Sequence, residues 1–100
     1  MRLKKGVRIR GLRPEIVLAA FMANEVCEKL GVEMVITSCT EGKHSWGSLH
    51  YSGCAFDFRK WVFSDNGVKA RKMLSEKLGQ EFDVVLERTH IHVEFQPKEA

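Results

Sequence analysis

All four histidines of this chain lie in two short clusters, His44 with His50 and His90 with His92. Asp57 follows the first cluster, and Glu87 precedes the second. A catalytic zinc site uses three protein ligands from His, Asp, Glu or Cys and leaves one position open for water. His50, Asp57 and one histidine of the second cluster would form such a set. Glu87 could then accept a proton from the activated water and pass it on.

A simpler interpretation exists for each histidine taken singly. A lone histidine in a strand is usually a surface residue or a hydrogen-bonded structural one, and an isolated H-x-H sequence often arises by chance. The clustering of all four histidines, together with an aspartate on the same predicted face, favours the metal site.

The end of the chain predicts a β-hairpin that positions the second cluster. The segments 82–87 and 90–95 alternate apolar and polar residues, and a short turn at 88–89 joins them. This register sets Val85 opposite His92 and Asp83 opposite Glu94, and opposed residues share a face. The polar face therefore carries Glu87, His90, His92 and Glu94. The apolar face carries Phe82, Val84, Leu86, Ile91, Val93 and Phe95.

A strand at 54–58 divides in the same way. Its apolar side carries Cys54, Phe56 and Phe58, and the opposite side carries Ala55, Asp57 and Arg59. Gly53 supplies the backbone freedom for a turn between His50 and this strand.

The other elements follow from periodicity and from Pro and Gly positions. Val7–Arg10 alternates and predicts a short edge strand. A helix should begin at Pro14 and end before Gly31, with a buried strand at 32–37 and a loop at 38–47. A second helix should start near 64–66, run to Leu78 and close at Gly79. The class is α+β, with a small antiparallel sheet and two main helices packed on one face.

Composition indicates one globular domain spanning residues 1–100. Hydrophobic residues make up 44% and charged residues 29% of the 100, which argues against disorder. No apolar run is long enough to cross a bilayer, so we expect no membrane insertion. No secretory signal is evident, which favours synthesis in the cytoplasm. Three widely spaced cysteines without a C-x-x-C pattern predict free, partly buried thiols.

Charge is unevenly distributed. Residues 1–13 hold six Lys or Arg and no acid, whereas the remaining residues hold 10 basic and 13 acidic groups. A nucleic-acid-binding protein more often spreads its basic groups over a folded face with aromatic residues between them. We therefore expect no nucleic-acid partner and interpret residues 1–13 as a basic N-terminal arm. Solvation of the arm is the simpler interpretation, and attraction to an anionic cell wall is the alternative.

The segment Ser48–Asp57, S-L-H-Y-S-G-C-A-F-D, matches the pattern S-x-H-x-x-G-x-A-x-D. It resembles the first zinc motif of the metallopeptidase family that contains bacterial and phage D-Ala-D-Ala carboxypeptidases and murein endopeptidases. It is also similar to the hedgehog signalling domain, which shares the zinc fold. His90-Ile91-His92 matches the H-x-H that closes the site in hedgehog and several murein peptidases.

The resemblance implies that His50, Asp57 and His92 bind Zn²⁺. His90 would then stabilise or shuttle protons beside the water, and His44 would line the cleft. An alternative takes His90 as the ligand, because Glu87 and His90 also fit the E-x-x-H form of some relatives. His92 is preferred because the following Val-Glu-Phe resembles the usual ending of the motif.

Two departures from the family pattern affect the catalytic and substrate-binding roles. Many relatives place the catalytic acid three residues before the last ligand, where this chain has Thr89, so Glu87 must serve as the base. Many also carry an upstream arginine for the substrate carboxylate. Here Lys43 or His44 could substitute, although lysine offers a point charge instead of a bidentate fork. Trp46 and Ser48 are the other candidate substrate-binding residues.

The sequence thus predicts a monomeric zinc peptidase that hydrolyses an amide bond in peptidoglycan stem peptides. By analogy with relatives, it would be a phage or prophage lysis enzyme acting on the cell wall. Whether the bond is D,D or L,D stays open. The alternative is a non-catalytic, zinc-containing binding module like hedgehog, and a basic nucleic-acid binder has only the arm in its favour.

Overall fold

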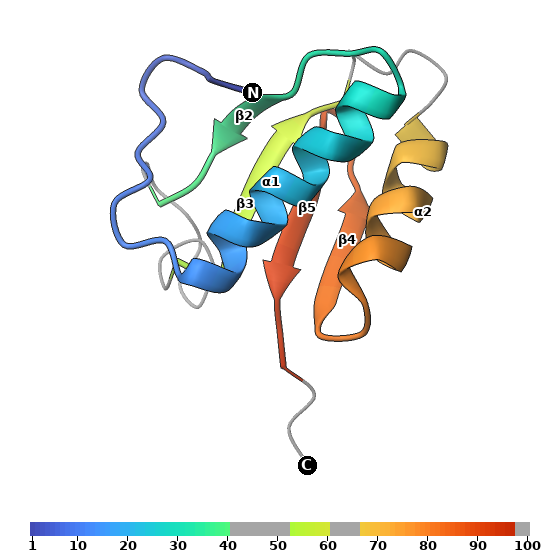
Figure 1. The fold of residues 1–100 in the computed structure, drawn as a ribbon. Coiled ribbons are helices and arrows are strands. Elements are labelled where there is room, and N and C mark those ends of the chain that lie inside the picture. Colours follow the sequence, from blue (N-terminus) through green and yellow to red (C-terminus); the bar gives the residue numbers. More distant parts are fainter. Residues whose placement is uncertain (41–52, 61–66, 98–100) are drawn as a thin grey trace.

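The computed structural model describes residues 1–40, 53–60 and 67–97, which form a mixed sheet covered on one face by two helices (Figure 1). The five strands are β1 (Arg2–Leu3), β2 (Val35–Ser38), β3 (Ala55–Arg59), β4 (Phe82–Leu86) and β5 (His90–Phe95). The helices are α1 (Pro14–Lys29) and α2 (Gly67–Leu78). The predicted α+β class with two helices against a sheet is confirmed.

The strands are arranged in the order β1-β2-β3-β5-β4. All neighbouring pairs are antiparallel except β1 and β2, which run parallel. The predicted small antiparallel sheet is found in β2, β3, β5 and β4, and the parallel edge strand β1, which was not predicted, makes the whole sheet mixed. Parallel neighbours need a long crossover connection, and α1, which lies between β1 and β2 in the chain, provides it.

Helix α1 forms where the sequence predicts it. Pro14 occupies the first turn, where its missing N–H has no intrahelical partner to lose, and Glu15 places a negative charge near the helix N-terminus. The chain leaves the helix through Gly31, which adopts a positive φ of 72°. The N–H of Val32 donates to the carbonyl of Cys27 at 3.0 Å. Val32 thus completes the helix end, and β2 begins three residues later than its predicted start.

The core lies between the helices and the inner face of the sheet. The buried face of α1 carries small side chains such as Ala19, Ala23 and Cys27, which let the helix approach the sheet closely. On the sheet, the rings of Phe56 and Phe58 stack at a centroid distance of 5.9 Å beneath the helices. The predicted hairpin register is confirmed, with the partner pairs Asp83–Glu94, Val84–Val93 and Val85–His92. The polar residues of β3 and β5 are consequently held on the opposite face of the sheet.

The N-terminal segment differs from the prediction. Val7–Arg10 is not a strand, and Arg2–Leu3 pairs with β2 instead. Tight turns on either side interrupt the segment: the N–H of Val7 donates to Lys4 O at 3.1 Å, and the N–H of Leu12 donates to Ile9 O at 3.1 Å. Glycines with positive φ, Gly6 and Gly11, permit these turns. Part of the predicted basic arm is therefore built into the sheet.

The remaining expectations concern the cysteines, the second helix and the bilayer. All three cysteines are free, with Cys27 and Cys39 buried and Cys54 half-buried, as the sequence predicts. The proposed start of the second helix at 64–66 lies outside the described residues, and its predicted end at Leu78 is confirmed. Within the described ranges, no helix is long and apolar enough to cross a membrane.

Candidate functional site

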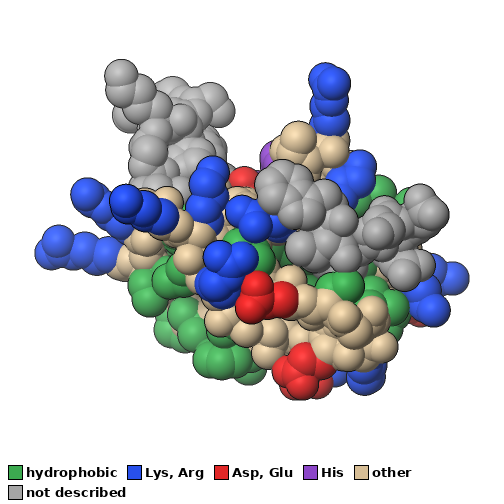
Figure 2. All heavy atoms as spheres, turned by 90° about the horizontal axis from the view of Figure 1, so that it is seen from above, with side chains coloured by type: hydrophobic (Ala, Val, Ile, Leu, Met, Phe, Trp, Pro, Cys, Tyr) green, Lys and Arg blue, Asp and Glu red, His purple; other side chains and the backbone are tan. Residues whose placement is uncertain are grey.

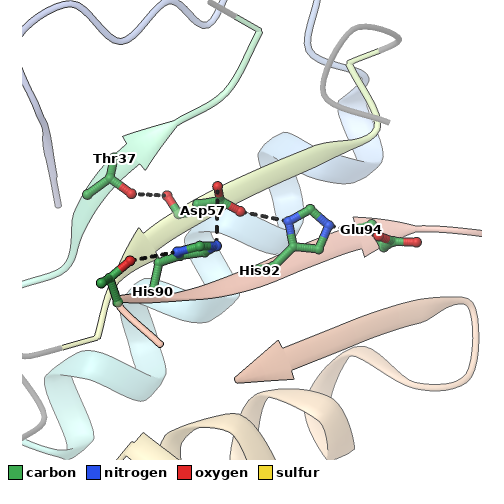
Figure 3. A network of polar contacts seen from close by, with 6 residues as sticks. Thr37, Asp57, His90, His92 and Glu94 are labelled. Carbon is green, nitrogen blue, oxygen red and sulfur yellow. Dashed lines mark hydrogen bonds and ion pairs between the residues drawn. The ribbon is translucent and has the colours of Figure 1, made fainter. Parts of the chain in front are cut away.

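Asp57 and two histidines lie side by side on the sheet face that points away from the helices (Figure 3). Asp57 on β3 is the register partner of His92 on β5, and His90 lies one pleat along the same strand. The Nδ1 atom of His92 lies 2.7 Å from Asp57 Oδ1, and the Nε2 atom of His90 lies 3.7 Å from Asp57 Oδ2. Each carboxylate oxygen of Asp57 therefore faces a different imidazole.

Glu94 completes this cluster on the far side of His92. Its Oε1 atom lies 2.7 Å from His92 Nε2, and its other oxygen accepts a hydrogen bond from the Gln96 side-chain amide. The His92 ring is thus held between two carboxylates, one at each nitrogen. The hydrogen bond with Asp57 raises the pKa of His92 above its usual value, burial opposes this shift, and Glu94 adds to it. In the absence of metal, the two carboxylates therefore make His92 easier to protonate than a free imidazole.

Neighbouring hydroxyl groups help to orient the site. The Thr37 hydroxyl on β2 donates to the backbone carbonyl of Asp57 at 3.4 Å, beside an irregular register between β2 and β3. The Thr89 hydroxyl lies 3.1 Å from His90 Nδ1. With Nδ1 engaged by Thr89, the Nε2 atom of His90 is directed toward Asp57.

Gly53, the glycine of the S-x-H-x-x-G-x-A-x-D pattern, has a specific structural role. It adopts a φ of +76°, and a Cβ atom built on it would lie 2.0 Å from the backbone oxygen of Gly11. The N–H of Arg13 donates to Gly53 O at 3.0 Å, which ties the start of α1 to the start of β3. A side chain at this position would push the two segments apart. The glycine therefore allows the N-terminal segment to cross just before β3.

Ala55, the small residue of the same pattern, lies on the polar face beside Asp57 and is fully buried. Its register partner on β5 is Glu94. A methyl group at this position leaves room for the carboxylate of Glu94 to reach His92. Gly53 thus permits the backbone path before β3, and Ala55 places a small buried side chain next to Glu94.

The structure brings together three of the predicted residues: Asp57, His90 and His92. Glu87 lies beyond the end of β4, where its backbone N–H donates to His90 O at 2.9 Å. Its side chain is exposed and, in the described part of the chain, makes no hydrogen bond or ion pair. The other predicted residues, namely Lys43, His44, Trp46, Ser48 and His50, lie outside the described residues.

In the sequence interpretation Glu94 belongs to the ending of the motif and is, with Asp83, the reserve candidate for the general base, but it has no predicted contact with His92. The alternation of the last strand places it on the polar face, but nothing in the pattern indicates contact with His92, which lies two residues earlier. Side chains at i and i+2 of a strand share a face, so this contact depends on rotamers that a sequence does not specify. The only sequence signal for this contact was the acidic residue two positions after the H-x-H, Glu94 itself.

The donor set around Asp57 fits two of the three ligands of a zinc site. Donors bound to tetrahedral zinc at about 2.0–2.1 Å lie roughly 3.3 Å apart, so the 2.7 Å contact between His92 Nδ1 and Asp57 Oδ1 is a hydrogen-bond distance that would have to widen if both atoms bound the metal. If Nε2–H of His92 donates to Glu94, Glu94 takes the usual place of a carboxylate that supports a metal-binding histidine, and the lone pair of Nδ1 is left on the side of Asp57, where a metal would bind. Within the described ranges, no three His, Cys, Asp or Glu side chains are placed to hold a metal ion together. His50, the third implied ligand, lies outside these ranges.

Comparisons of the chain with protein-family models, with curated proteins and with solved structures found no match.

Proposed function

We propose that this chain is a zinc-dependent peptidase that hydrolyses an amide bond in peptidoglycan stem peptides. The observation that carries the proposal is the direct contact between Asp57 and His92, two residues far apart in sequence that the motif resemblance implies as ligands. Their shared polar face is separate from the apolar core, as a site open to substrate requires.

In this proposal, His50, Asp57 and His92 hold the metal, and Glu94 orients His92 through its Nε2 atom. Bound zinc would supply a Lewis acid for the scissile carbonyl and lower the pKa of a water molecule. The second carboxylate oxygen of Asp57 faces His90, so His90 is the nearest described residue able to support the developing oxyanion or transfer a proton. His44 is the alternative for this role.

Glu87 is the proposed general base. Besides Asp57, Glu94 is the only carboxylate in contact with His92 within the described ranges, and its oxygens are engaged by His92 and Gln96. Glu87 is exposed and lies at the hairpin end beside His90, so its carboxylate has room to reach a water molecule on this face. Lys43, Trp46 and Ser48 would bind the substrate, whose peptide carboxylates complement Lys43.

The peptidoglycan substrate and a role in phage or prophage lysis rest on the motif resemblance. In this interpretation the protein acts as a monomer on the cell wall.

A non-catalytic zinc-containing binding module is the second candidate. One observation favours it: the carboxylate of Glu87 contacts no member of the Asp57 cluster in the described part of the chain. A site that holds zinc without a positioned base would bind a ligand and leave it intact.

Digestion of purified peptidoglycan separates the two candidates. The zinc-loaded protein should release new amino and carboxyl ends that mass spectrometry identifies, and this would also reveal the bond that is cut. Glu87→Gln should retain zinc and lower turnover by about 10²–10⁴-fold, the usual contribution of a positioned base. Glu81→Gln, an exposed glutamate on the same hairpin, is the matched control and should cleave normally. A fully loaded wild-type protein that releases no new ends would exclude the peptidase and leave the binding module.

A further inference from the structure

Among the residues that the structure describes, most of the exposed large apolar side chains lie between Met1 and Phe21. Helix α1 buries one face against the sheet, yet its outer face carries Val17, Leu18 and Phe21, which are 41%, 58% and 54% exposed. These positions, at i, i+1 and i+4, form one patch over the first turns of the helix. We name them the outer α1 patch. The helix does not need them for its packing, because Ile16, Ala19 and Ala20 already supply the buried face.

The segment before α1 combines exposed apolar residues with cations. Leu3 and Ile9 are 42% and 54% exposed, and the neighbouring Lys4, Lys5 and Arg10 are exposed as well. Lys4, Lys5 and Arg10 form no ion pair within the described ranges. We name this group the N-terminal strip. Figure 2 shows Lys and Arg side chains gathered on the side where Figure 1 draws the N-terminal segment, with an apolar area adjoining them.

The strip is held in place by the fold. The N–H of Lys4 donates to Ile36 O at 2.8 Å, the N–H of Thr40 donates to Arg8 O at 3.1 Å, and the Thr40 hydroxyl donates to Arg10 O at 2.9 Å. Because these bonds fix the backbone, its cations are presented without the entropy cost of ordering a free tail.

Acidic groups near this surface are already paired. Glu33 accepts from Arg2 at 3.1 Å, and Glu15 lies 3.6 Å from Arg13. The two acids in the second half of α1 lie away from the outer α1 patch: Glu25 pairs with Lys77 at 3.0 Å, and Glu28 accepts a hydrogen bond from the Asn24 side-chain amide at 2.9 Å. α1 carries no Lys or Arg before Lys29, so the cations near the outer α1 patch are those of the N-terminal strip.

We propose that the N-terminal strip and the outer α1 patch bind the surface of an anionic phospholipid bilayer. Lys and Arg pair with lipid phosphates at the headgroup level, while exposed Leu, Ile and Phe side chains enter the boundary with the acyl chains. A soluble polyanion would use the cations but leave the outer α1 patch exposed to water. This mode of binding requires no spanning helix, and it does not depend on the proposed peptidase activity.

Vesicle co-sedimentation tests the proposal. The wild-type protein should bind vesicles containing phosphatidylglycerol and should not bind pure phosphatidylcholine vesicles. Each cation near an anionic surface strengthens partitioning by roughly fivefold, so the double variant Lys4→Gln with Lys5→Gln should bind about 25-fold more weakly. The matched control, Lys69→Gln with Lys72→Gln on α2, removes the same charge from exposed positions elsewhere. It should bind nearly as well as wild type, and equal losses in both variants would overturn the proposal.

The apolar contribution has its own test. Phe21→Ser should weaken vesicle binding by about tenfold or more, whereas Val68→Ser, at a 66% exposed position on α2, should have little effect. Circular dichroism should show that all variants fold. Unchanged binding of Phe21→Ser would mean that the cations act alone on polyanions, and the lipid proposal would fail. It would also fail if sedimentation showed a dimer that Phe21→Ser dissociates, because the patch would then cover a second copy.

Discussion

Gly53→Ala should destabilise the domain far more than the same change at a glycine with open surroundings. At Gly53 the added Cβ would meet the Gly11 backbone oxygen at 2.0 Å and the Gly11 carbonyl carbon at 3.0 Å. Neither is the flexible end of a side chain, so the two backbone segments must separate. A left-handed conformation costs a non-glycine residue about 1–2 kcal/mol, and overpacking adds about 1–3 kcal/mol. The expected loss in free energy of unfolding is therefore about 2–5 kcal/mol.

Gly79→Ala is the matched control, because Gly79 also has a positive φ, +86°, but no atom lies within 4 Å of the position that a Cβ would take there. It should lose only the conformational share, about 1–2 kcal/mol. Urea denaturation monitored by circular dichroism measures both losses. For a domain of this size, each 1 kcal/mol corresponds to a melting-temperature change of roughly 4–8 °C, so thermal melts provide a second readout. Equal destabilisation by the two variants would refute the proposed close crossing between Gly53 and Gly11.

Three further predictions concern titration, thiol reactivity and the core. In the metal-free protein the raised pKa of His92 contributes stability that is fully present below about pH 6.5 and is lost as pH rises through the folded-state pKa; the urea midpoint should fall over that range, and His92→Gln should abolish the fall. Burial raises the pKa of the Cys27 thiol to about 11, so iodoacetamide at neutral pH should modify half-buried Cys54 first and Cys27 only on unfolding, which peptide mapping would show; early labelling of Cys27 would contradict its burial. Phe56→Ala should cost about 3–5 kcal/mol in urea denaturation, because Phe56 is fully buried, and a loss below 1 kcal/mol would show that this part of the core is loosely packed.

The hairpin and the polar face were predictable because both depend on parity. Once Val85 is opposite His92, the face of every other residue in β4 and β5 is fixed, and small changes in the turn that keep this parity do not alter it. The α1 helix was predictable for a similar reason, since its buried stripe and its terminal Pro14 and Gly31 agree. The contact between Asp57 and His92 then required only that β3 lie next to β5.

The features that the sequence did not reveal depend on competition between distant segments. Val7–Arg10 has a strand-like pattern, but turns at Gly6 and Gly11 and the hydrogen bonds from Thr40 determine its conformation. The reason for glycine at position 53 is the crossing of Gly11, which no local pattern encodes. The roles of Lys43, His44, Trp46, Ser48 and His50 stay predictions.

The zinc content of the purified protein, compared with that of its Asp57→Ala variant, tests the central claim most directly. Asp57 faces both imidazoles of the site, so its removal should leave the histidines unable to complete a three-ligand set. Asp83→Ala is the matched control, because Asp83 lies on the same face of the neighbouring strand and is the register partner of Glu94. We expect about one zinc per chain in the wild type and in the control, and almost none in Asp57→Ala. A folded wild-type protein that binds no zinc, or an Asp57→Ala variant that keeps its full zinc content, would contradict the claim.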